Sequence, residues 1–476
     1  MKYITRFAPS PTGKAHVGNI RTALFDYLAS RSSGGQFNLR IEDTDRERFV
    51  PEAIDYIHKT LAWLGLKPDG EVIYQSDRIN LYQKRVNELV GKNLAYKCFC
   101  SHERLEKLKK DQKQAKKAPV YDRHCLNLTK EEISQKQRSK NSFVIRFRIP
   151  DKPKEITWDD KIRDKVTIAT ETLEDFIILK SDGWPTYNLA NVIDDHEQKI
   201  NLAIRGEEFI PSTPKHILLY QAFGWPSPEF AHMPLTLGKD KTKLSKRHGD
   251  TAILNYKDKG YLAEAMINFL VLLGWNPGGG STEEIFSLKE LEKIFRVENI
   301  NKAAAVFNLE RLDWMNGIYI RKLSARELTD RIIKFNPKFN KVRKEFLERI
   351  VAVEQTRLKT LADFAEISDF YFNLPKYSKN TLIFKKSSLT ATKIGLEASY
   401  GALKNINWAK FKVEDFDKLL ARVVAENKLN NADIFWPVRV ALSGKEKSPS
   451  PAELLWVFGQ EESLKRLEFT LKNLKN

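Results

Sequence analysis

Residues 2–32 read KYITRFAPSPTGKAHVGNIRTALFDYLASRS, and this stretch decides the fold of the first half of the chain. Its apolar run from Tyr3 to Ala8 predicts a buried strand, and the residues from Asn19 to about Ser32 predict a helix. The residues between them therefore lie at a strand-to-helix junction. Such a junction presents free backbone N–H groups and the positive end of a helix dipole, which together favour phosphate.

The turn at this junction carries side chains that suit phosphates. Gly13 and Gly18 let a ligand approach the backbone, and His16 can donate a hydrogen bond to a phosphoryl oxygen. Thr12 and Asn19 stand in the same turn. The alternative interpretation of His16 is a residue that only caps the helix.

A second motif, KLSKR, occupies residues 243–247, more than two hundred positions further along. Lys243 and Lys246 flank Ser245 in a segment rich in small and charged residues, as expected of a loop that closes over a triphosphate. Taken alone, the motif is more typical of a solvated surface loop. The two motifs in this order predict an ATP site formed by Thr12, His16, Gly18, Asn19, Lys243 and Lys246.

The arrangement of elements along the chain indicates several domains. Strand-like runs alternate with amphipathic helices over residues 1–89, and the pattern resumes over residues 182–240. This predicts one α/β nucleotide-binding fold with a parallel sheet, split by an insertion at 90–181 that mixes a basic helix with strand signals. Residues 241–321 carry the lysine motif into a helical connection, and residues 322–476 show helical periodicity.

Length and charge restrict the class of protein. At 476 residues the chain exceeds what one hydrophobic core usually organises. Its 80 Lys and Arg against 62 Asp and Glu give a formal net charge of +18, which favours a polyanionic partner over an acidic substrate protein. A lysine-rich bias of the source genome is the alternative explanation.

Cysteine use and hydropathy bear on location. Cys98, Cys100 and Cys125 lie in one short region, so a bound metal or reduced thiols are expected rather than a disulfide framework. No apolar run is long enough to span a bilayer, and the chain begins directly with a strand rather than with a signal-like segment. We therefore expect a cytoplasmic protein that does not enter a membrane.

The two motifs resemble the HIGH and KMSKS signatures of class I aminoacyl-tRNA synthetases. More narrowly, several stretches are similar to glutamyl-tRNA synthetases of the bacterial type: residues 6–19, 39–48, 182–196, 204–208, 212–216 and 243–249. The resemblance implies a split Rossmann-like catalytic domain (1–89 and 182–240), an inserted acceptor-binding domain (90–181), a connecting stem-contact domain (241–321) and an all-α anticodon-binding region (322–476).

The resemblance also implies an amino-acid pocket, lined in the family by the residues that match Arg6, Ala8, Ser10, Glu42, Tyr187, Asn191 and Arg205.

Within this pocket we expect Arg205 to pair with the side-chain carboxylate of glutamate, helped by Arg6 and Tyr187, because guanidinium groups pair with carboxylates in a bidentate way. Glu42 would then receive the α-ammonium group. Two alternatives stand beside this: Arg205 forms a structural ion pair with the neighbouring residues 207–208, or Glu42 is neutralised within its own charged segment.

The cysteines resemble the zinc site of many family members. Where some relatives have a histidine as the fourth ligand, this chain has Asn127, a poor ligand for zinc. His102 and His124 are close enough in sequence to substitute. The resemblance favours one structural Zn²⁺ held by Cys98, Cys100, Tyr121 and Cys125, against three reduced, partly buried thiols.

The implied activity is the ligation of L-glutamate to the 3′ end of tRNA(Glu) through a glutamyl-adenylate, with ATP and Mg²⁺ as reactants and AMP and pyrophosphate as products. His16, Lys243 and Lys246 would stabilise the transferring phosphoryl group. We expect a monomer, and charging of tRNA(Gln) stays open. The alternatives are a shortened relative that glutamylates a tRNA base, which would lack the helical tail, and an inactive paralogue that only binds RNA.

Overall fold

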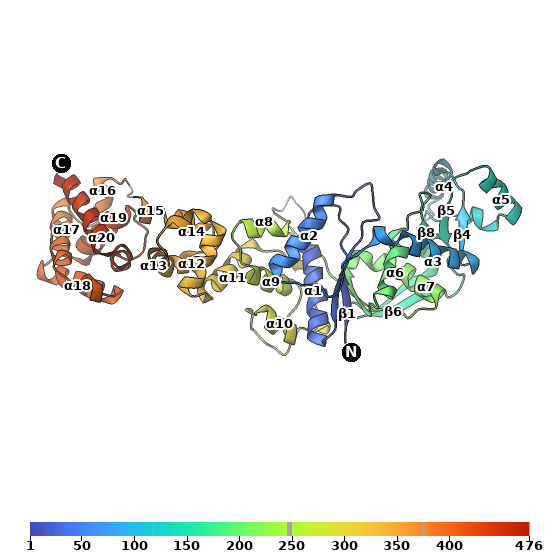
Figure 1. The fold of residues 1–476 in the computed structure, drawn as a ribbon, viewed down its shortest axis with the longest axis horizontal. Coiled ribbons are helices and arrows are strands. Elements are labelled where there is room, and N and C mark those ends of the chain that lie inside the picture. The colour runs from blue at the N-terminus through green and yellow to red at the C-terminus, as the bar shows by residue number, and fades with distance from the viewer. Residues whose placement is uncertain (118, 245–249, 374–375, 476) are drawn as a thin grey trace. The chain divides into compact units, whose positions relative to one another are not determined.

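The computed structural model describes residues 1–117, 119–244, 250–373 and 376–475, in two compact units. Unit 1 comprises Met1–Lys257 and Ala263–Leu309, and unit 2 comprises Asp258–Leu262 and Glu310–Asn476. All strands of the described residues lie in unit 1, whereas the described part of unit 2 is helical (Figure 1). Within the described ranges, no helix is both long and apolar enough to cross a membrane.

Two sets of parallel strands form the centre of unit 1. The first has the order β1 (Ile4–Phe7), β2 (Gln36–Ile41), β3 (Ile73–Tyr74). The second has the order β9 (Leu202–Gly206), β10 (Glu229–Met233), β6 (Glu155–Asp160), with β7 (Asp164–Ala169) antiparallel at its edge.

The two sets meet at the beginnings of β1 and β9. The Ile4 backbone N–H donates to the Asn201 side-chain oxygen at 2.7 Å, and the Asn201 N–H donates to the Ile4 carbonyl at 3.1 Å. The chain leaves β1 toward β2 on one side, while β9 lies on the other. This is a topological switch point, and open α/β sheets bind ligands beyond the carboxyl ends of the strands there.

The connection from β1 to β2 follows the sequence closely. Helix α1 (Val17–Ser33) packs beside β1 and ends at Gly34, whose φ of 68° is a left-handed conformation that glycine adopts without strain (Figure 1). A Cβ at Gly35 would lie 1.8 Å from the Tyr3 carbonyl oxygen. Glycine at this position therefore lets β2 begin directly alongside β1.

The remaining helices of unit 1 cover these strands or connect them. They are α2 (Pro51–Leu64), α3 (Ile79–Gly91), α6 (Tyr187–Glu197), α7 (Thr213–Phe223), α8 (Ile253–Asp258), α9 (Ala263–Leu272) and α10 (Leu288–Ile294). A short parallel pair joins β11 (Thr236–Leu237) to β12 (Ala305–Val306). Buried apolar side chains from α3, α6, α7 and six strands form one continuous core cluster.

The segment between the two halves of this fold has its own antiparallel sheet. The strand order is β4 (Ala95–Cys98), β5 (Val144–Phe147), β8 (Ile177–Leu179), with α4 (His102–Gln114) and α5 (Lys130–Arg138) beside it (Figure 1). The predicted α+β character of this segment is confirmed. Its hairpin β6–β7 instead extends the sheet of β9 and β10.

Unit 2 consists of helices: α11 (Leu309–Lys322), α12 (Ala325–Phe335), α13 (Lys344–Glu354), α14 (Asp363–Ile367), α15 (Asp369–Phe372), α16 (Lys379–Leu382), α17 (Leu389–Lys404), α18 (Val413–Glu426), α19 (Asn431–Ser443) and α20 (Pro451–Lys475). Local capping explains several of their starts. Ser324 and Glu327, for example, form a reciprocal capping box at α12. The helical periodicity predicted from residue 322 onward is confirmed.

Candidate active site

Five predicted pocket residues converge at the switch point between β1 and β9. Arg6 lies on β1, Glu42 directly follows β2, Tyr187 and Asn191 lie on the first turns of α6, and Arg205 lies on β9. Tertiary contacts join them in pairs. The Asn191 amide donates to Glu42 at 3.3 Å, and the Arg205 guanidinium donates to the Tyr187 hydroxyl at 3.4 Å.

Arg6 is buried and its charge is compensated within the protein. Its Nε donates to Asp195 Oδ1 at 2.9 Å, and Arg40 Nη1 donates to the same oxygen at 2.7 Å. Burial opposes the charge of Arg6 most strongly, but Asp195 and Asp26 together offset this effect, so the pKa of Arg6 is raised. Asp195 therefore holds the guanidinium groups of both Arg6 and Arg40, so the charge of Arg6 already has a partner within the protein.

Glu42 is buried with one oxygen engaged. Oε1 accepts from Arg40 Nη2 at 3.0 Å and from the Asn191 amide at 3.3 Å. Among the described residues, none donates a hydrogen bond to Oε2. Burial raises the pKa of Glu42, and the Arg40 charge acts in the opposite direction. Arg40 thus pairs with Glu42, as the alternative interpretation requires, but it leaves one oxygen for a cation.

Arg205 is 5% exposed and bonds to neutral acceptors. Its Nε donates to His232 Nε2 at 3.1 Å, its Nη1 to His216 Nδ1 at 3.1 Å, and its Nη2 to Thr213 Oγ1 at 2.9 Å. The rings of Phe209 and Phe230 lie 5.7 and 5.2 Å from the guanidinium carbon. Among the described residues, no carboxylate forms a salt bridge with Arg205, so its charge suits an anionic ligand.

The neighbouring glutamates are engaged elsewhere. Glu207 accepts from the Arg163 guanidinium and from the Leu235 backbone N–H at 3.0 Å. Glu208 Oε1 lies 3.9 Å from Lys243 Nζ. The alternative interpretation of Arg205 as an ion pair with residues 207–208 is therefore wrong for the described structure.

His16 caps α1 with one ring nitrogen, and the other ring nitrogen can donate a hydrogen bond to a ligand. Its Nδ1 accepts from the Gly18 backbone N–H at 3.1 Å, so a neutral ring carries its hydrogen on Nε2. Partial desolvation and the Lys243 charge lower the pKa of His16. A Cβ at Gly18 would lie 3.1 Å from the ring, so glycine leaves room for this capping geometry. Capping and phosphate binding are thus compatible roles of one ring.

The chain segment that directly follows the lysine motif contacts the first motif. The Val17 N–H donates to the Thr251 carbonyl at 2.9 Å, and His16 forms an antiparallel bridge with Ala252, just beyond the lysine motif. Lys243 is exposed and forms an antiparallel bridge with Leu237, the last residue of β11. Residues 245–249, which include Ser245 and Lys246, lie outside the described residues.

The other predicted site residues near the N-terminus lie in the turn between β1 and α1 or at its two ends. Ala8 follows β1 and is half-buried, whereas Ser10, Thr12 and Asn19 are exposed. The turn is held by backbone hydrogen bonds, from the Thr12 N–H to the Ser10 carbonyl at 2.9 Å and from the Glu42 N–H to the Pro9 carbonyl at 3.0 Å. Exposed polar groups beside a helix N-terminus suit a phosphate ligand.

Residues 2–314 match the family model described as tRNA synthetases class I (E and Q), catalytic domain. The chain belongs to this family. Residues 326–471 match the model of an anticodon binding domain, so this class I aminoacyl-tRNA synthetase carries a helical region of that type. The resemblance seen in the sequence is confirmed.

Relatives of this class I synthetase match over its full length. The glutamate–tRNA ligase of Clostridium kluyveri is 42% identical over 100% of this chain and 98% of its own length. That of Dehalococcoides mccartyi is 42% identical over 98% of each chain. The crystal structure of a glutamate tRNA ligase from Elizabethkingia meningosepticum, in complex with its amino acid, has a TM-score of 0.89 at 33% identity and covers 100% of both chains.

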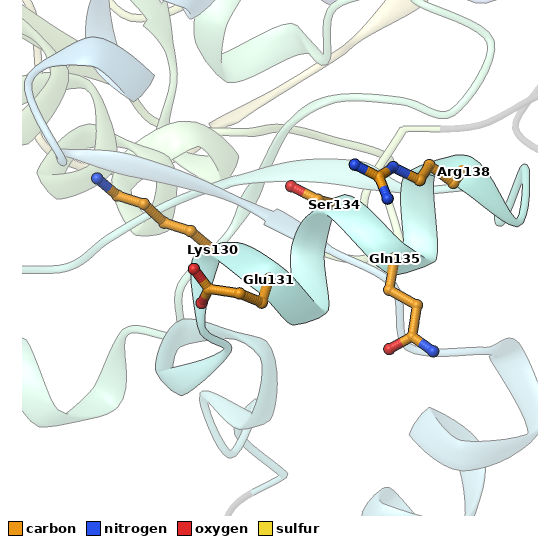
Figure 2. Close-up of a pocket in the computed structure, with 5 residues that line it drawn as sticks. All are labelled: Lys130, Glu131, Ser134, Gln135 and Arg138. Carbon is orange, nitrogen blue, oxygen red and sulfur yellow. The ribbon is translucent and has the colours of Figure 1, made fainter.

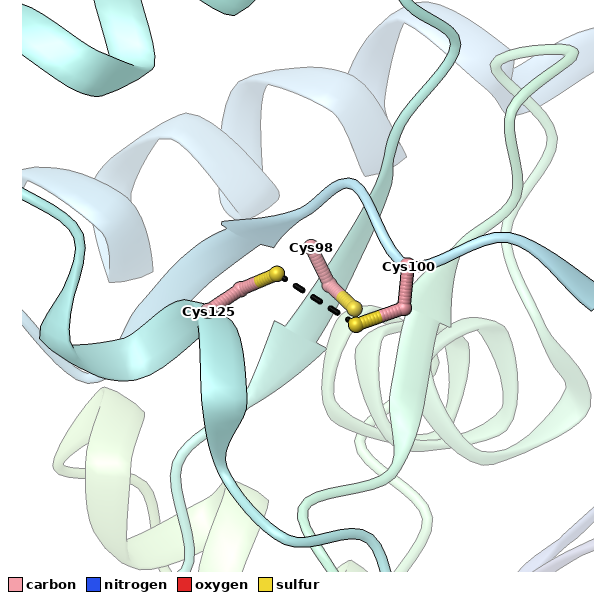
Figure 3. Close-up of side chains that lie close together, drawn as sticks. All are labelled: Cys98, Cys100 and Cys125. Carbon is pink, nitrogen blue, oxygen red and sulfur yellow. Dashed lines mark hydrogen bonds between the residues drawn. The ribbon is translucent and has the colours of Figure 1, made fainter. Parts of the chain in front are cut away.

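The three cysteines of the synthetase form a compact cluster. Their sulfur atoms lie within 4.8 Å of one another, and Figure 3 shows the sulfurs of Cys98, Cys100 and Cys125 pointing together. The Tyr121 hydroxyl lies 3.3 Å from the Cys98 sulfur and 3.5 Å from the Cys100 sulfur. Hydrogen bonds from Cys125 and Tyr121 lower the pKa of Cys98. Three thiols and one hydroxyl at these distances fit a tetrahedral zinc site.

The other proposed zinc ligands stand apart from this cluster. Among the described His, Cys, Asp and Glu side chains, the group that could hold a metal contains the three cysteines and neither His102 nor His124. Asn127 ends a short 3₁₀ helix, residues 124–127. The Arg146 guanidinium lies 4.0 Å from the centre of the Tyr121 ring and helps to hold that side chain.

A hollow on the inserted segment offers little for chemistry. Its lining side chains come from one helix, α5 (Figure 2): Lys130, Glu131, Ser134, Gln135 and Arg138. They carry mixed charges and face solvent from a single element. We therefore assign no site to it.

Several residues of the synthetase pocket escaped prediction: Arg40, Asp160, Asp195, Thr213, His216 and His232. Arg40, Asp195, Thr213 and His216 stand in stretches that resemble the family, but the sequence does not show which residues contact one another. Asp160 and His232 lie on β6 and β10, and only the pairing of those strands brings them toward β9.

Proposed function

We propose that the protein ligates L-glutamate to the 3′ end of tRNA(Glu) through a glutamyl-adenylate intermediate. One observation carries the proposal. Arg205 is a buried cation surrounded by neutral acceptors, and Glu42 has one carboxylate oxygen with no described donor in the same pocket. A buried cation and a buried anion so arranged complement the side-chain carboxylate and the α-ammonium group of glutamate.

The proposed chemistry needs no protein nucleophile. The amino-acid α-carboxylate attacks the α-phosphate of ATP and pyrophosphate leaves; a terminal ribose hydroxyl of tRNA then attacks the adenylate. His16 Nε2–H, Lys243 and Lys246 stabilise charge on the transferring phosphoryl group, while Thr12, Gly18 and Asn19 line the ATP site. Class I synthetases use ATP with Mg²⁺, which offsets the negative charge of the triphosphate.

The amino-acid pocket also binds its ligand through charged and hydrogen-bonding side chains. Arg205 binds the side-chain carboxylate with Tyr187, whose hydroxyl accepts from Arg205 and can donate its own hydrogen. Glu42 and Asn191 bind the ammonium end. The remaining members of the pocket, Arg6, Ala8 and Ser10, form its wall on the β1 side.

We assign the domains as the sequence predicts: residues 1–89 and 182–240 catalytic, 90–181 acceptor-binding, 241–321 connecting, and 322–476 anticodon-binding. Hairpin β6–β7 (residues 155–169) is the exception, because it pairs with the catalytic sheet. The match of residues 326–471 to an anticodon binding domain supports the last of the four assignments. It also argues against the shortened enzyme that modifies a tRNA base, because that type lacks the helical tail.

We further propose one structural Zn²⁺ held by Cys98, Cys100, Tyr121 and Cys125, supported by the spacing of the thiols and the hydroxyl. The three cysteines support a cytoplasmic location, because they lie close together and yet form no disulfide. We propose a monomer that charges tRNA(Glu), with tRNA(Gln) as the second tRNA to test.

The direct test is ATP–pyrophosphate exchange with the full chain, in the presence and absence of tRNA(Glu). We expect exchange that requires glutamate and tRNA, with glutamine and aspartate giving little. Binding of tRNA without any amino-acid-dependent exchange would support the inactive RNA-binding paralogue instead. Aminoacylation of purified tRNA(Glu) and tRNA(Gln) then decides the range of tRNA substrates.

A further inference from the structure

Arg205 is the last member of a buried hydrogen-bonded chain that begins on another strand. His232 stands opposite Arg205 in the β9–β10 register, and Asp160 ends β6, which pairs with β10 at Phe230. Asp160 is 4% exposed and His232 is fully buried. The contacts run from Asp160 Oδ2 to His232 Nδ1, and from His232 Nε2 to Arg205 Nε at 3.1 Å.

The chemistry of these groups fixes where each hydrogen lies. An arginine side chain only donates hydrogen bonds, so His232 Nε2 must accept from Arg205 Nε. A neutral imidazole with an acceptor at Nε2 carries its hydrogen on Nδ1, and that hydrogen points to Asp160 Oδ2. The His232 tautomer is therefore determined by its two neighbours together.

Asp160 is suited to impose this tautomer. Its Oδ1 accepts backbone N–H groups from Ile162 at 3.1 Å, Arg163 at 3.0 Å and His232 at 3.1 Å. Burial opposes its charge, but the contacts with His232 and these N–H groups offset this, so the pKa of Asp160 is lowered. An ionised carboxylate can only accept hydrogen bonds. His232 Nδ1 must therefore carry a hydrogen and donate it to Asp160.

We propose that Asp160 and His232 are positioning residues for glutamate selectivity: they hold the Arg205 guanidinium in place through a neutral acceptor, which leaves its charge for the substrate carboxylate. The inference rests on the proposed function of Arg205. A carboxylate in direct contact with Arg205 would hold it equally well but would compensate its charge. Here the carboxylate of Asp160 is separated from Arg205 by an imidazole ring.

The same logic applies on the other side of Arg205. His216 Nδ1 must accept from Arg205 Nη1, so its hydrogen lies on Nε2 and points to the Asn188 side-chain oxygen, 3.1 Å away. Burial, followed by the Arg205 charge, lowers the pKa of His216 well below its ordinary value. Both imidazoles beside Arg205 thus act as neutral acceptors.

Asp160→Asn is the decisive substitution. It keeps the shape of the side chain but reverses the direction of the hydrogen bond with His232 Nδ1. The three backbone N–H groups need an oxygen at Oδ1, so the new amide nitrogen takes the place of Oδ2 and donates to His232 Nδ1. His232 must then carry its hydrogen on Nε2, which can no longer accept from Arg205 Nε and can only donate, for example to Thr213 Oγ1, 3.1 Å away. We expect kcat/KM for glutamate to fall about tenfold or more, mainly through KM, with KM for ATP unchanged within about twofold.

Asp159→Asn is the matched control, since Asp159 is the preceding residue of β6 and is exposed on the opposite face. The control should leave the glutamate to glutamine ratio of kcat/KM unchanged, whereas Asp160→Asn should lower it. A double-mutant cycle with His232→Gln adds a sharper measurement. Glutamine can present an acceptor to Arg205 without help from Asp160, so Asp160→Asn should cost less in that background. Equal costs in the two backgrounds would overturn the proposal.

A second pair of variants covers the case in which Asp160→Asn does not fold. His232→Gln retains an acceptor toward Arg205 and His232→Leu removes it, so His232→Leu alone should lose the preference for glutamate. Equal ratios in these two variants would contradict the inference. The proposed function fails separately: in that case wild-type protein shows no glutamate-dependent exchange, or replacing Arg205 leaves its preference for glutamate intact.

Discussion

At the scale of single residues, the proposed selectivity for glutamate depends on which buried arginine has no carboxylate partner. Arg6 and Arg40 share Asp195, whereas Arg205 has neutral partners among the described side chains. An unpaired buried guanidinium is costly until an anion binds. In the proposed pocket glutamate supplies that anion and glutamine does not, a difference of about 2 to 5 kcal/mol for a buried pair.

We predict that Arg205→Ala shrinks or inverts the ratio of kcat/KM for glutamate over glutamine. Glutamate loses a charge-assisted pair in a water-poor pocket, while glutamine loses none. The ratio is measured at a temperature where both proteins remain folded. Arg21→Ala is the control, because Arg21 is equally buried but donates to the backbone carbonyls of Leu273 and Pro234.

The control should lose stability and use both substrates less well in parallel. An unchanged ratio in Arg205→Ala would remove Arg205 from the selectivity role, and Arg6 with Tyr187 would become the next candidates.

At the scale of elements, the proposed ATP site depends on the strand-to-helix turn at His16 and on the segment that carries the lysine motif. The strand-to-helix turn provides the helix N-terminus, and the lysine motif returns to it through the bridge between His16 and Ala252. The beginning of the lysine motif is held by a backbone hydrogen bond, which the Leu244 N–H donates to the Thr236 carbonyl at 2.9 Å. The described residues on both sides of 245–249 are therefore anchored, Leu244 at Thr236 and Ala252 at His16.

For this segment we predict that Lys246→Ala lowers adenylate formation by roughly 10² to 10³, the usual effect of losing one transition-state donor. The affinity for tRNA should change much less. Pyrophosphate exchange at saturating ATP measures the first quantity, and filter binding measures the second. Lys239→Ala, on the same stretch of chain, should be close to wild type; a folded Lys246→Ala enzyme with full turnover would rule out the role.

The second element-scale prediction concerns zinc between β4 and the 3₁₀ helix of residues 124–127. Protein purified without chelator should contain about one equivalent of zinc. Tyr121→Phe should weaken retention of that zinc against a competing chelator, because it removes the proposed fourth ligand. Tyr96→Phe is the control, since its hydroxyl donates to Asp175 at 2.7 Å instead.

Absence of metal, together with three rapidly titrating thiols, would favour the reduced-cysteine alternative. Equal retention in the two tyrosine variants would leave the site with three cysteine ligands and a different fourth group.

At the scale of the whole molecule, the net charge of +18 predicts that tRNA binding depends strongly on salt. Contacts with phosphates release counterions, so KM for tRNA should rise at least about tenfold between 50 and 200 mM salt. KM for glutamate should change within about twofold, because the pocket charges are buried and less screened. A flat salt dependence for tRNA would support compositional bias as the sole origin of the charge.

The order and type of the elements followed from the sequence alone. The apolar run before the first motif forms β1, the predicted helix after it is α1, and the regular elements of the described tail from residue 322 are all helices. These features depend on local periodicity and turn chemistry, which a sequence displays directly. The family also followed from the sequence, because the residues that bind its substrates cluster in short recognisable stretches.

Tertiary structure alone decided how the pocket charges are shared. No local pattern could indicate that Arg6 pairs with Asp195, 189 positions away, while Arg205 meets neutral histidines. Strand pairing also assigned hairpin β6–β7, and with it Asp160, to the catalytic sheet. The physical reason is that charge compensation and tautomer choice depend on distances of about 3 Å between residues far apart in sequence, and only the packed fold sets those distances.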